Sequence, residues 1–252
     1  MRWCFQDLRN VYMVLDYVVG GELFTYLGNL GQFTKRMTVF FAAEIVLVLE
    51  YLHSLGIVYR DLKPENVLID RDGHIRITDF GFAKYLDDST FTVCGTVDYL
   101  APEIIKKQGH GFGVDIWAVG VLIYEMLAGV PPFDDDCQIA VCTRILDVDL
   151  DFPPEFDDDT IDIVEGLCTE EEEDRLGCGP RGFAEIKEHP FFSTVDWDAA
   201  LKRKMMPPFV PAVDEEDDTS CFPDYDEVDV TALEAEDYDV DQELFSEFCK
   251  RE

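Results

Sequence analysis

Residues 57–83 combine acidic, basic and amide side chains with a strong turn signal. Two short β-branched runs, Val67–Ile69 and Ile75–Ile77, flank the pair Asp72-Gly73, a combination typical of a β-hairpin. Polar segments precede and follow the two runs. A hairpin here brings the polar residues before it close to those after it.

The polar residues around this hairpin suit chemistry on a phosphate group. An acid can accept the proton of an attacking hydroxyl, and a lysine can contact the phosphoryl group that is transferred. Amide and carboxylate oxygens are the ligands that Mg²⁺ prefers. The sequence therefore predicts a site in which these roles fall to Asp61, to Lys63 and to the metal-binding pair Asn66 and Asp79.

Three apolar stretches have the length and composition to support the hairpin. Residues 34–55 are apolar on most faces, with Thr34 as candidate N-cap, and predict a core helix beneath the polar loop. Residues 113–129 are apolar nearly all round, which predicts a central buried helix. Residues 11–18 are apolar and β-branched, and they predict a buried strand that ends at Gly20-Gly21.

Composition limits the class of protein. The chain has 252 residues, 47% of them hydrophobic, which is enough for one globular core. Its formal net charge of −34, from 54 acidic and 20 basic residues, excludes nucleic-acid binding as the main function and favours basic partners. Eight cysteines without paired spacing indicate reduced thiols in a cytoplasmic or nuclear protein. No apolar run reaches the length of a bilayer-spanning helix, so we expect no membrane span.

Three motifs in order resemble the catalytic set of eukaryotic protein kinases: Arg60-Asp61 with Asn66, Asp79-Phe80-Gly81, and Ala101-Pro102-Glu103. Three others are similar to the AGC group, and within it to the catalytic subunits of cAMP-dependent protein kinase: Phe82-Ala83-Lys84, Cys94-Gly95-Thr96 and Phe245-Ser246-Glu247-Phe248. Tyr59 departs from the pattern, because most kinases have His at that place.

The resemblance implies an α+β, protein-kinase-like fold, mainly the helical large lobe with a remnant of the small-lobe sheet and an AGC-type C-terminal tail. We expect the small-lobe remnant and hinge over residues 1–17, the large lobe over 18–192 and an acidic tail over 193–252. It also implies that Asp115 binds the backbone of the catalytic loop and that Arg175 pairs with Glu103. His53 is then a structural histidine.

The resemblance implies ATP and Mg²⁺ as cofactors, with backbone groups of the hinge on the adenine edge. The residues implied in nucleotide binding are Asp16, Val18, Glu22, Leu68 and Phe222. Two of these have ordinary alternatives, because an acid such as Glu22 favours a helix N-terminus and Leu68 is also an unremarkable core leucine.

The resemblance further implies basic protein substrates with arginines before the phosphorylated Ser or Thr, together with a regulatory or inhibitory subunit as a partner. The acids implied in binding these arginines are Glu22, Glu65, Asp98 and Glu125, although acids at four positions are less surprising in so acidic a chain. Thr96 would bridge the substrate loop to Asp61 and Lys63. Thr92 is the implied phosphosite, where a phosphate would pair with Arg60 and Lys84. Without a phosphate, Thr92 is a loop threonine.

Two functions remain open from the sequence. The residues before Tyr12 contain no Gly-rich phosphate loop, strand lysine or helix glutamate, all of which a complete kinase carries. The first expectation is a Ser/Thr kinase that transfers the ATP γ-phosphate to basic substrates, represented here by a truncated chain of low activity. The alternative is a catalytically inactive kinase lobe that binds substrates or regulatory subunits.

Overall fold

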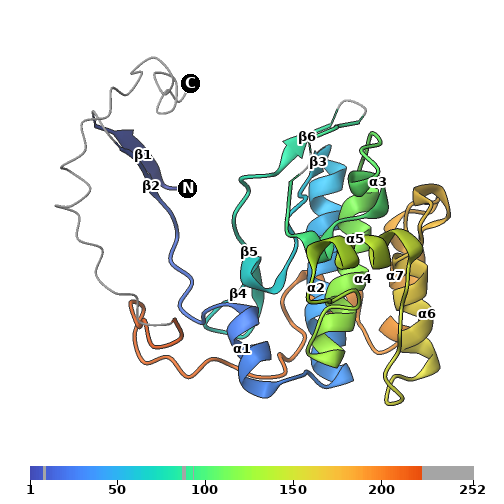
Figure 1. The fold of residues 1–252 in the computed structure, drawn as a ribbon. Coiled ribbons are helices and arrows are strands. Elements are labelled where there is room, and N and C mark those ends of the chain that lie inside the picture. The colour runs from blue at the N-terminus through green and yellow to red at the C-terminus, as the bar shows by residue number, and fades with distance from the viewer. Residues whose placement is uncertain (8–9, 87–88, 93, 223–252) are drawn as a thin grey trace.

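The computed structural model describes residues 1–7, 10–86, 89–92 and 94–222, which form a helical body with small two-stranded sheets (Figure 1). The helices are α1 Leu23–Leu30, α2 Lys35–Ser54, α3 Pro102–Ile105, α4 Gly113–Ala128, α5 Gln138–Asp147, α6 Asp158–Leu167, α7 Phe183–Glu188 and α8 Trp197–Leu201. The strands are β1 Trp3–Gln6, β2 Val11–Val14, β3 Ile57–Val58, β4 Val67–Ile69, β5 Ile75–Ile77 and β6 Lys84–Tyr85. The pairs β1–β2, β3–β6 and β4–β5 are all antiparallel.

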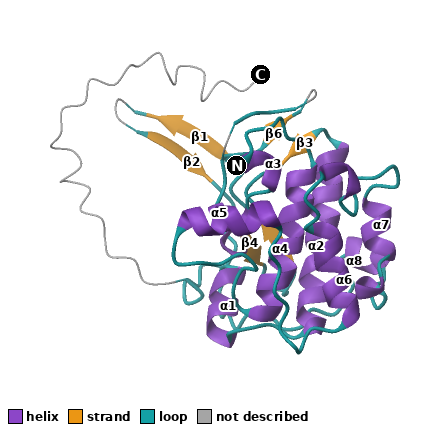
Figure 2. Ribbon diagram, turned by 45° about the vertical axis from the view of Figure 1, so that its right-hand side comes forward, coloured by secondary structure: helices purple, strands orange, loops and turns teal. Residues whose placement is uncertain are grey.

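Helix α4 forms the centre of the body, with α2 and α6 packed against it (Figure 2). Its residues from Gly113 to Leu127 are all buried, as the sequence predicts. The ring of Trp117 is stacked on that of Phe133 with centroids 5.6 Å apart. The helix ends at Gly129, whose φ of 81° lies in the left-handed region that favours glycine. Burial on all sides explains why the sequence of α4 shows almost no polar face.

Helix α2 confirms the predicted core helix, and Thr34 caps it by accepting a hydrogen bond from the Met37 N–H at 3.4 Å. The expectation that no apolar run reaches a bilayer-spanning length is wrong for this helix. Its 20 residues are long and apolar enough by length and composition alone, and 61% of the relevant window is buried inside the protein. The same apolar character serves packing against α4, because a helix surrounded by core has no need of a polar face.

The predicted hairpin is formed by β4 and β5, with Leu68 opposite Arg76. Gly73 closes its turn through an N–H bond to the Asp70 carbonyl at 2.9 Å, with a φ of 83°. Glu44 of α2 binds the hairpin next to its turn. One of its carboxylate oxygens contacts His74, and the other accepts the Ile75 N–H at 2.9 Å. A buried acid in an otherwise apolar helix therefore fixes the hairpin on the helical body.

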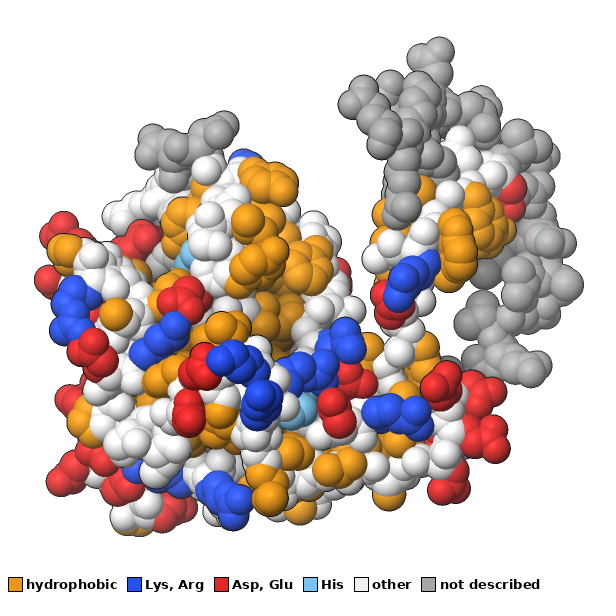
Figure 3. All heavy atoms as spheres, turned by 180° about the vertical axis from the view of Figure 1, so that it is seen from behind, with side chains coloured by type: hydrophobic (Ala, Val, Ile, Leu, Met, Phe, Trp, Pro, Cys, Tyr) orange, Lys and Arg blue, Asp and Glu red, His pale blue; other side chains and the backbone are white. Residues whose placement is uncertain are grey.

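The strand predicted over residues 11–18 is shorter and lies at the surface. Strand β2 covers only Val11–Val14, and all four residues are exposed. Figure 3 shows apolar side chains on the surface of the β1–β2 hairpin, which Figure 1 places to one side of the helical body. The prediction of burial is wrong because a strand that is apolar on both faces needs a layer on each side, and this hairpin is not covered by such layers within the described residues.

A buried ion pair joins α3 to the segment that follows α6. The guanidinium of Arg175, which is 1% exposed, donates to both carboxylate oxygens of Glu103 at 2.9 and 3.1 Å. Arg175 also donates to the carbonyls of Gly113 and Thr169. The pairing implied by the resemblance is confirmed. The mixed, mostly helical architecture likewise confirms the expected fold class, while the division at residues 17 and 192 stays a prediction.

We predict that Glu103→Gln lowers the free energy of unfolding by about 3 kcal/mol, because it leaves the buried Arg175 guanidinium without its counter-charge. Urea denaturation at pH 7 measures the change. The matched control is Glu188→Gln, which removes the acid of the exposed Arg181–Glu188 pair and should leave the midpoint unchanged. Equal midpoints for all three proteins would contradict the prediction.

Candidate active site

The loop between β3 and β4 is held in place by one carboxylate of α4. Asp115, which is 1% exposed, accepts the backbone N–H of Tyr59 at 2.9 Å and that of Arg60 at 2.7 Å. His53 of α2 contacts the same carboxylate at 2.8 Å, which confirms its structural role. Arg60 has a φ of 69°, a left-handed conformation that is uncommon outside glycine and is maintained by surrounding contacts.

The structure brings together three residues predicted for chemistry. The Asn66 side chain donates to the carboxylate of Asp61 at 2.7 Å and to its carbonyl at 2.8 Å. Lys63 lies 3.4 Å from the same Asp61 oxygen, Oδ2, and donates to the Thr96 hydroxyl at 3.1 Å, as expected for a bridging threonine. The second oxygen of Asp61, Oδ1, is buried and accepts no hydrogen bond from the described residues. This oxygen therefore keeps an acceptor capacity that none of the described residues uses.

Asp79 follows β5 and is exposed. Its carboxylate accepts the Gly81 N–H at 3.0 Å, and its φ of 52° is again left-handed. The preceding Thr78 donates its N–H to the Asn66 carbonyl at 3.0 Å, while its own carbonyl accepts the Tyr59 hydroxyl at 2.5 Å. Burial, followed by the nearby acids, raises the pKa of Tyr59 far above its ordinary value, so Tyr59 stays protonated and keeps donating. These bonds tie the segment before Asp79 to the catalytic loop.

The donor set fits magnesium. Because the Asn66 amide nitrogen is occupied by Asp61, its oxygen is left as an acceptor, and Asp79 supplies an exposed carboxylate. Within residues 1–7, 10–86, 89–92 and 94–222 there is no group of three His, Cys, Asp or Glu side chains that could hold a metal by themselves. Magnesium commonly binds one or two protein oxygens and completes its shell with phosphates and water. Asn66 and Asp79 would hold it in this way.

Of the residues implied in nucleotide binding, Glu22 and Leu68 lie side by side at one edge of the β4–β5 hairpin. Glu22 pairs with Leu68 in an isolated antiparallel bridge, and the buried Val18 lies a few residues before it. Glu22 is the N-cap residue of α1 and makes no side-chain capping bond, so the alternative of an acid that favours a helix N-terminus stays open. The ring of Phe222 lies 5.7 Å from that of Tyr17, which places this part of the tail beside the hinge segment.

Two of the implied residues are less informative. The Asp16 carboxylate is exposed and is paired with Arg2 at 2.7 Å, so only its backbone groups can serve as the resemblance implies. Leu68 is half-buried, which is compatible with both a nucleotide floor and ordinary core. Their part in nucleotide binding stays a prediction.

The acids implied in substrate binding gather around Glu125 of α4. Glu125 is 8% exposed and accepts a hydrogen bond from the Tyr99 hydroxyl. Burial, and then the nearby charges of Glu65 and Asp98, raise the pKa of Glu125 to about 7. Burial and the charge of Glu65 also raise the pKa of Glu22. Carboxylates that repel one another in this way form a site for cationic side chains.

Two residues of this site escape prediction from sequence patterns. Gly95 has a φ of 105°, and a Cβ at this position would lie 3.0 Å from the Arg60 carbonyl, so glycine allows the segment to approach the catalytic loop. Tyr99, the partner of Glu125, lies 26 positions away in the chain. Gly95 belongs to the motif Cys94-Gly95-Thr96, but the motif does not say why a glycine is needed there. The reason is the close approach to Arg60, which only the structure shows.

Thr92 is exposed, as a phosphosite must be. Its implied phosphate ligands make other bonds: Arg60 donates to the Phe82 carbonyl at 2.8 Å, and Lys84 donates to the Thr90 hydroxyl at 3.0 Å. The tail motif Phe245-Ser246-Glu247-Phe248, named from the resemblance, lies outside the described residues.

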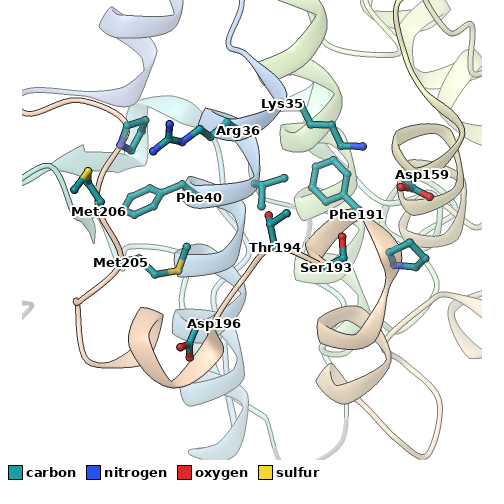
Figure 4. Close-up of a pocket in the computed structure, with 13 residues that line it drawn as sticks. Lys35, Arg36, Phe40, Asp159, Phe191, Ser193, Thr194, Asp196, Met205 and Met206 are labelled. Atoms are coloured by element: carbon teal, nitrogen blue, oxygen red, sulfur yellow. The ribbon is translucent and has the colours of Figure 1, made fainter.

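A larger hollow lies away from these residues. It has a volume of about 680 Å³ and is formed by the start of α2, residues 190–196 and residues 205–208 (Figure 4). In Figure 4 Phe40, Met205 and Met206 lie together on one side of it, with Phe191 on the other. None of the predicted site residues lines it. The hollow next to Asp61 is far smaller, about 10 Å³, roughly the room that one water needs.

An acid bonded to an amide, a lysine beside that acid and a second acid across a hairpin define a protein kinase catalytic core. The chain belongs to the protein kinase family, because the profile described as "Protein kinase domain" matches residues 1–192. It is 50% identical over 227 residues to the human "cAMP-dependent protein kinase catalytic subunit PRKX", covering 90% of this chain and 63% of the relative. It is 48% identical over 248 residues to "cAMP-dependent protein kinase catalytic subunit 3" of Drosophila melanogaster, covering 98% of this chain and 42% of the relative. These matches confirm the resemblance to cAMP-dependent kinase catalytic subunits.

A third relative gives the same result. The "cAMP-dependent protein kinase catalytic subunit" of Dictyostelium discoideum is 50% identical over 223 residues, covering 88% of this chain and 34% of the relative. This chain therefore spans between about a third and two thirds of the length of these three relatives.

We predict that Asp115→Asn destabilises the catalytic loop, because an amide of the same size cannot accept both the Tyr59 and the Arg60 N–H. A buried N–H without a partner costs about 1–3 kcal/mol. The free energy of unfolding should fall by that amount, and hydrogen exchange at these two amides should accelerate. Asp162→Asn is the control, since Asp162 is mostly exposed and its contact is with the side chain of His189. Unchanged exchange at Tyr59 and Arg60 would refute the role given to Asp115.

Proposed function

We propose that this chain is the substrate-binding and catalytic part of a Ser/Thr protein kinase, which transfers the γ-phosphate of ATP to Ser or Thr of basic protein substrates. The observation that carries the proposal is the state of Asp61. One of its oxygens is bound by Asn66 and approached by Lys63, while the other is buried and accepts no bond from the described residues. A general base needs this arrangement: one carboxylate oxygen fixes the orientation of the side chain, and the other is left to accept a proton.

The side chains divide the reaction between them. Asp61 Oδ1 accepts the hydrogen bond of the substrate hydroxyl, orients it and takes its proton as the new oxygen–phosphorus bond forms and the bond to ADP breaks. Lys63, held between Asp61 and the Thr96 hydroxyl, contacts the transferred group from the side of the substrate loop. Asn66 and Asp79 hold magnesium, which, when bound, neutralises the charge on the phosphates.

Nucleotide binding is proposed along the hairpin edge. The backbone of Asp16 and Val18 would bond the adenine, with Leu68 beneath it and Glu22 near the ribose. The bridge between Glu22 and Leu68 supports this, because it holds the two residues side by side. Phe222 would approach from the tail, where it already lies against Tyr17.

Substrate preference follows from the acids around Glu125. The buried Glu125 with Glu65 and Asp98 near it, and Glu22 near Glu65, suit the arginines of a basic peptide, since bidentate arginine–carboxylate pairs fix both energy and register. The net charge of −34 would steer such peptides toward the protein.

A second protein is a proposed partner. The similar human, fly and Dictyostelium proteins are named as catalytic subunits, a word that implies another subunit. We propose a regulatory or inhibitory subunit that occupies the acidic site around Glu125. We also propose that the protein is located in the cytoplasm or nucleus.

In the full-length protein, Asp79→Ala should abolish magnesium-dependent phosphorylation of a basic peptide while leaving peptide binding intact, because Asp79 acts on the metal and not on the peptide. Phosphate transfer from labelled ATP and peptide binding by fluorescence anisotropy measure the two effects. The control is Asp72→Ala in the hairpin turn, which removes an exposed carboxylate that is bonded to Arg203. Full turnover in Asp79→Ala would remove Asp79 from the mechanism. Peptide binding without any transfer by the unmodified protein would favour the alternative, a lobe that binds substrates without phosphorylating them.

Binding of a peptide with paired arginines before its serine should tighten as the pH rises through about 7. Glu125 is protonated below its raised pKa, and arginine pairs with the ionised form, so binding releases a proton. Calorimetry in buffers of different ionisation enthalpy measures this release. Glu125→Gln should remove it and weaken binding of that peptide more than binding of one whose arginines follow the serine. Equal losses for both peptides would leave only general electrostatic attraction.

A further inference from the structure

The hollow at the start of α2 has no part in the proposed catalytic and substrate sites. Its volume of about 680 Å³ falls within the range of about 300–1,000 Å³ that is typical of ligand-binding sites. Three segments that are remote in the chain form it, namely the start of α2, residues 190–196 and residues 205–208 (Figure 4). We refer to it as the α2 hollow.

The α2 hollow has a buried apolar floor and an exposed apolar rim. Its floor includes Val39, Phe40 and Phe191, which are 6%, 4% and 2% exposed. Met206 lines the rim and is 78% exposed. Large apolar side chains that stay exposed around a concave surface mark interaction sites, and methionine suits them because its flexible, unbranched side chain adapts to a partner. The α2 hollow therefore suits a large apolar side chain of a binding partner.

Two cations at the α2 hollow have no partner among the described residues. Arg36 lines the hollow and is exposed, and its side chain makes no hydrogen bond or ion pair within the part of the chain that the structure describes. The same is true of Lys204, which directly precedes Met205. Lys35, by contrast, is engaged, because its ammonium lies 2.6 Å from the Asp157 carboxylate. Arg36 and Lys204 are therefore available for an anionic group of a ligand.

The acids of the α2 hollow lie away from Arg36. In Figure 4 the Arg36 side chain extends toward Met206, whereas Asp159 lies on the opposite side of the hollow. Asp159 belongs to the first turn of α6 and is exposed. Asp196 is engaged in capping α8, where it accepts the Ala199 N–H at 3.0 Å. The charge of the hollow is therefore divided, positive at Arg36 and negative at the start of α6, and such a division gives an elongated ligand one preferred orientation.

The chemistry of the α2 hollow decides what occupies it. A purely apolar ligand would leave the charge of Arg36 unused, and a basic segment would be repelled by it. A segment that carries a large apolar side chain next to acidic residues matches both features. Its apolar side chain packs on the floor, and its carboxylate accepts two parallel N–H bonds from the guanidinium. The α2 hollow therefore favours an acidic segment with an apolar anchor.

The described part of this chain leads away from the α2 hollow. Pro208 still lines the hollow. Phe222 instead lies beside the hinge segment, with its ring 5.7 Å from that of Tyr17 (Figure 1). The residues that follow Phe222 thus start at the hinge and not at the hollow. This favours a segment of a separate protein as the occupant.

We propose that the α2 hollow is a docking site for an acidic segment of a partner protein, which places a large apolar side chain against Phe40 and Phe191 and a carboxylate on Arg36. The acidic site around Glu125 is proposed to take basic segments, so the two sites select segments of opposite charge. Docking is tested through binding alone, so its failure is separate from a failure of phosphate transfer.

The experiment uses a fluorescently labelled synthetic peptide, Glu-Asp-Glu-Glu-Leu-Phe-Gly-Ser, and measures its binding to the whole chain by fluorescence anisotropy. The sequence and its reverse are both tested, and the order that binds more tightly serves as the acidic probe. Two matched peptides replace either the four acids with Gln or the Leu-Phe pair with Ser-Ser. We expect each replacement to weaken binding at least about tenfold, because each removes one of the two matched features. Equal binding of all three peptides would overturn the proposal.

Substitutions in the chain locate the site. Arg36→Gln should weaken binding of the acidic probe about tenfold, because a bond between two charged groups is lost, and Met206→Ser should weaken it as well. The controls are Arg181→Gln, which removes an exposed arginine that does not line the hollow, and Ile139→Ser, which removes an apolar side chain of the same 78% exposure. Both controls should bind the probe as the unmodified chain does. Equal losses in the controls would show general attraction and would overturn the assignment to the α2 hollow.

NMR of methyl-labelled methionine gives a measurement that needs no substitution. Met205 and Met206 line the α2 hollow, whereas Met13 is exposed on the β1–β2 hairpin and serves as the internal reference. The acidic probe should shift the resonances of Met205 and Met206 and leave that of Met13 in place. Equal shifts at Met13 and Met206 would show unspecific contact with exposed apolar side chains and would overturn the proposal.

A last comparison separates a partner from this chain's own tail. Residues 214–248 contain many acids and no Lys or Arg, with Phe245 and Phe248 near their end, so their sequence has a similar chemistry. The acidic probe is therefore also titrated into a chain that carries both Phe245→Ser and Phe248→Ser. We expect equal affinities for this chain and the unmodified one. Binding that is at least about tenfold tighter in the substituted chain would show that the tail competes for the hollow, and would overturn the assignment to a separate protein.

Discussion

The whole arrangement depends on one carboxylate placed inside an apolar helix. Asp115 would be strongly destabilising in α4 if it stood alone, since a buried charge without partners is among the costliest groups in a fold. It is tolerated because two backbone amides and one imidazole surround it. The same bonds fix the backbone of Arg60 in its left-handed conformation. Asp61 follows Arg60 directly in the chain, and the guanidinium of Arg60 donates to the Phe82 carbonyl.

The other buried acids follow the same rule. Glu44 holds the hairpin turn, Glu103 holds Arg175, Glu125 holds Tyr99 and Asp61 holds Asn66. Each contact joins segments that are irregular or distant in the chain to one of the helices or to the catalytic loop. Among the described residues, the few acids that are buried bind other segments of the chain, whereas the remaining acids are half-buried or exposed.

The extent to which the sequence predicts this structure depends on the range of each interaction. The β4–β5 hairpin, α2 and α4 were predictable because their signals are local: a turn pair, a capping threonine and an unbroken apolar run. The proximity of Asp61, Asn66 and Lys63 was predictable because they are close in the chain. The pairing of Tyr99 with Glu125 and the approach of Gly95 to Arg60 join remote segments, and no local pattern encodes them. The burial expected for β2 was wrong. An apolar strand sequence shows that the strand can pack against other elements, but it does not show that such elements lie next to it.

The uncovered β1–β2 hairpin has a consequence for the chain in solution. Among the described residues it presents Trp3 at 67% and Met13 at 60% exposure, and its two short strands pair with each other along their whole length. Such a ribbon is a template for strand exchange between copies, and what opposes that association is the mutual repulsion of molecules carrying −34 charges. Ions screen this repulsion over about 8 Å at physiological ionic strength. Salt therefore has two opposed effects on this protein. It lowers the affinity for cationic peptides, and it weakens the repulsion that keeps the hairpins of two copies apart.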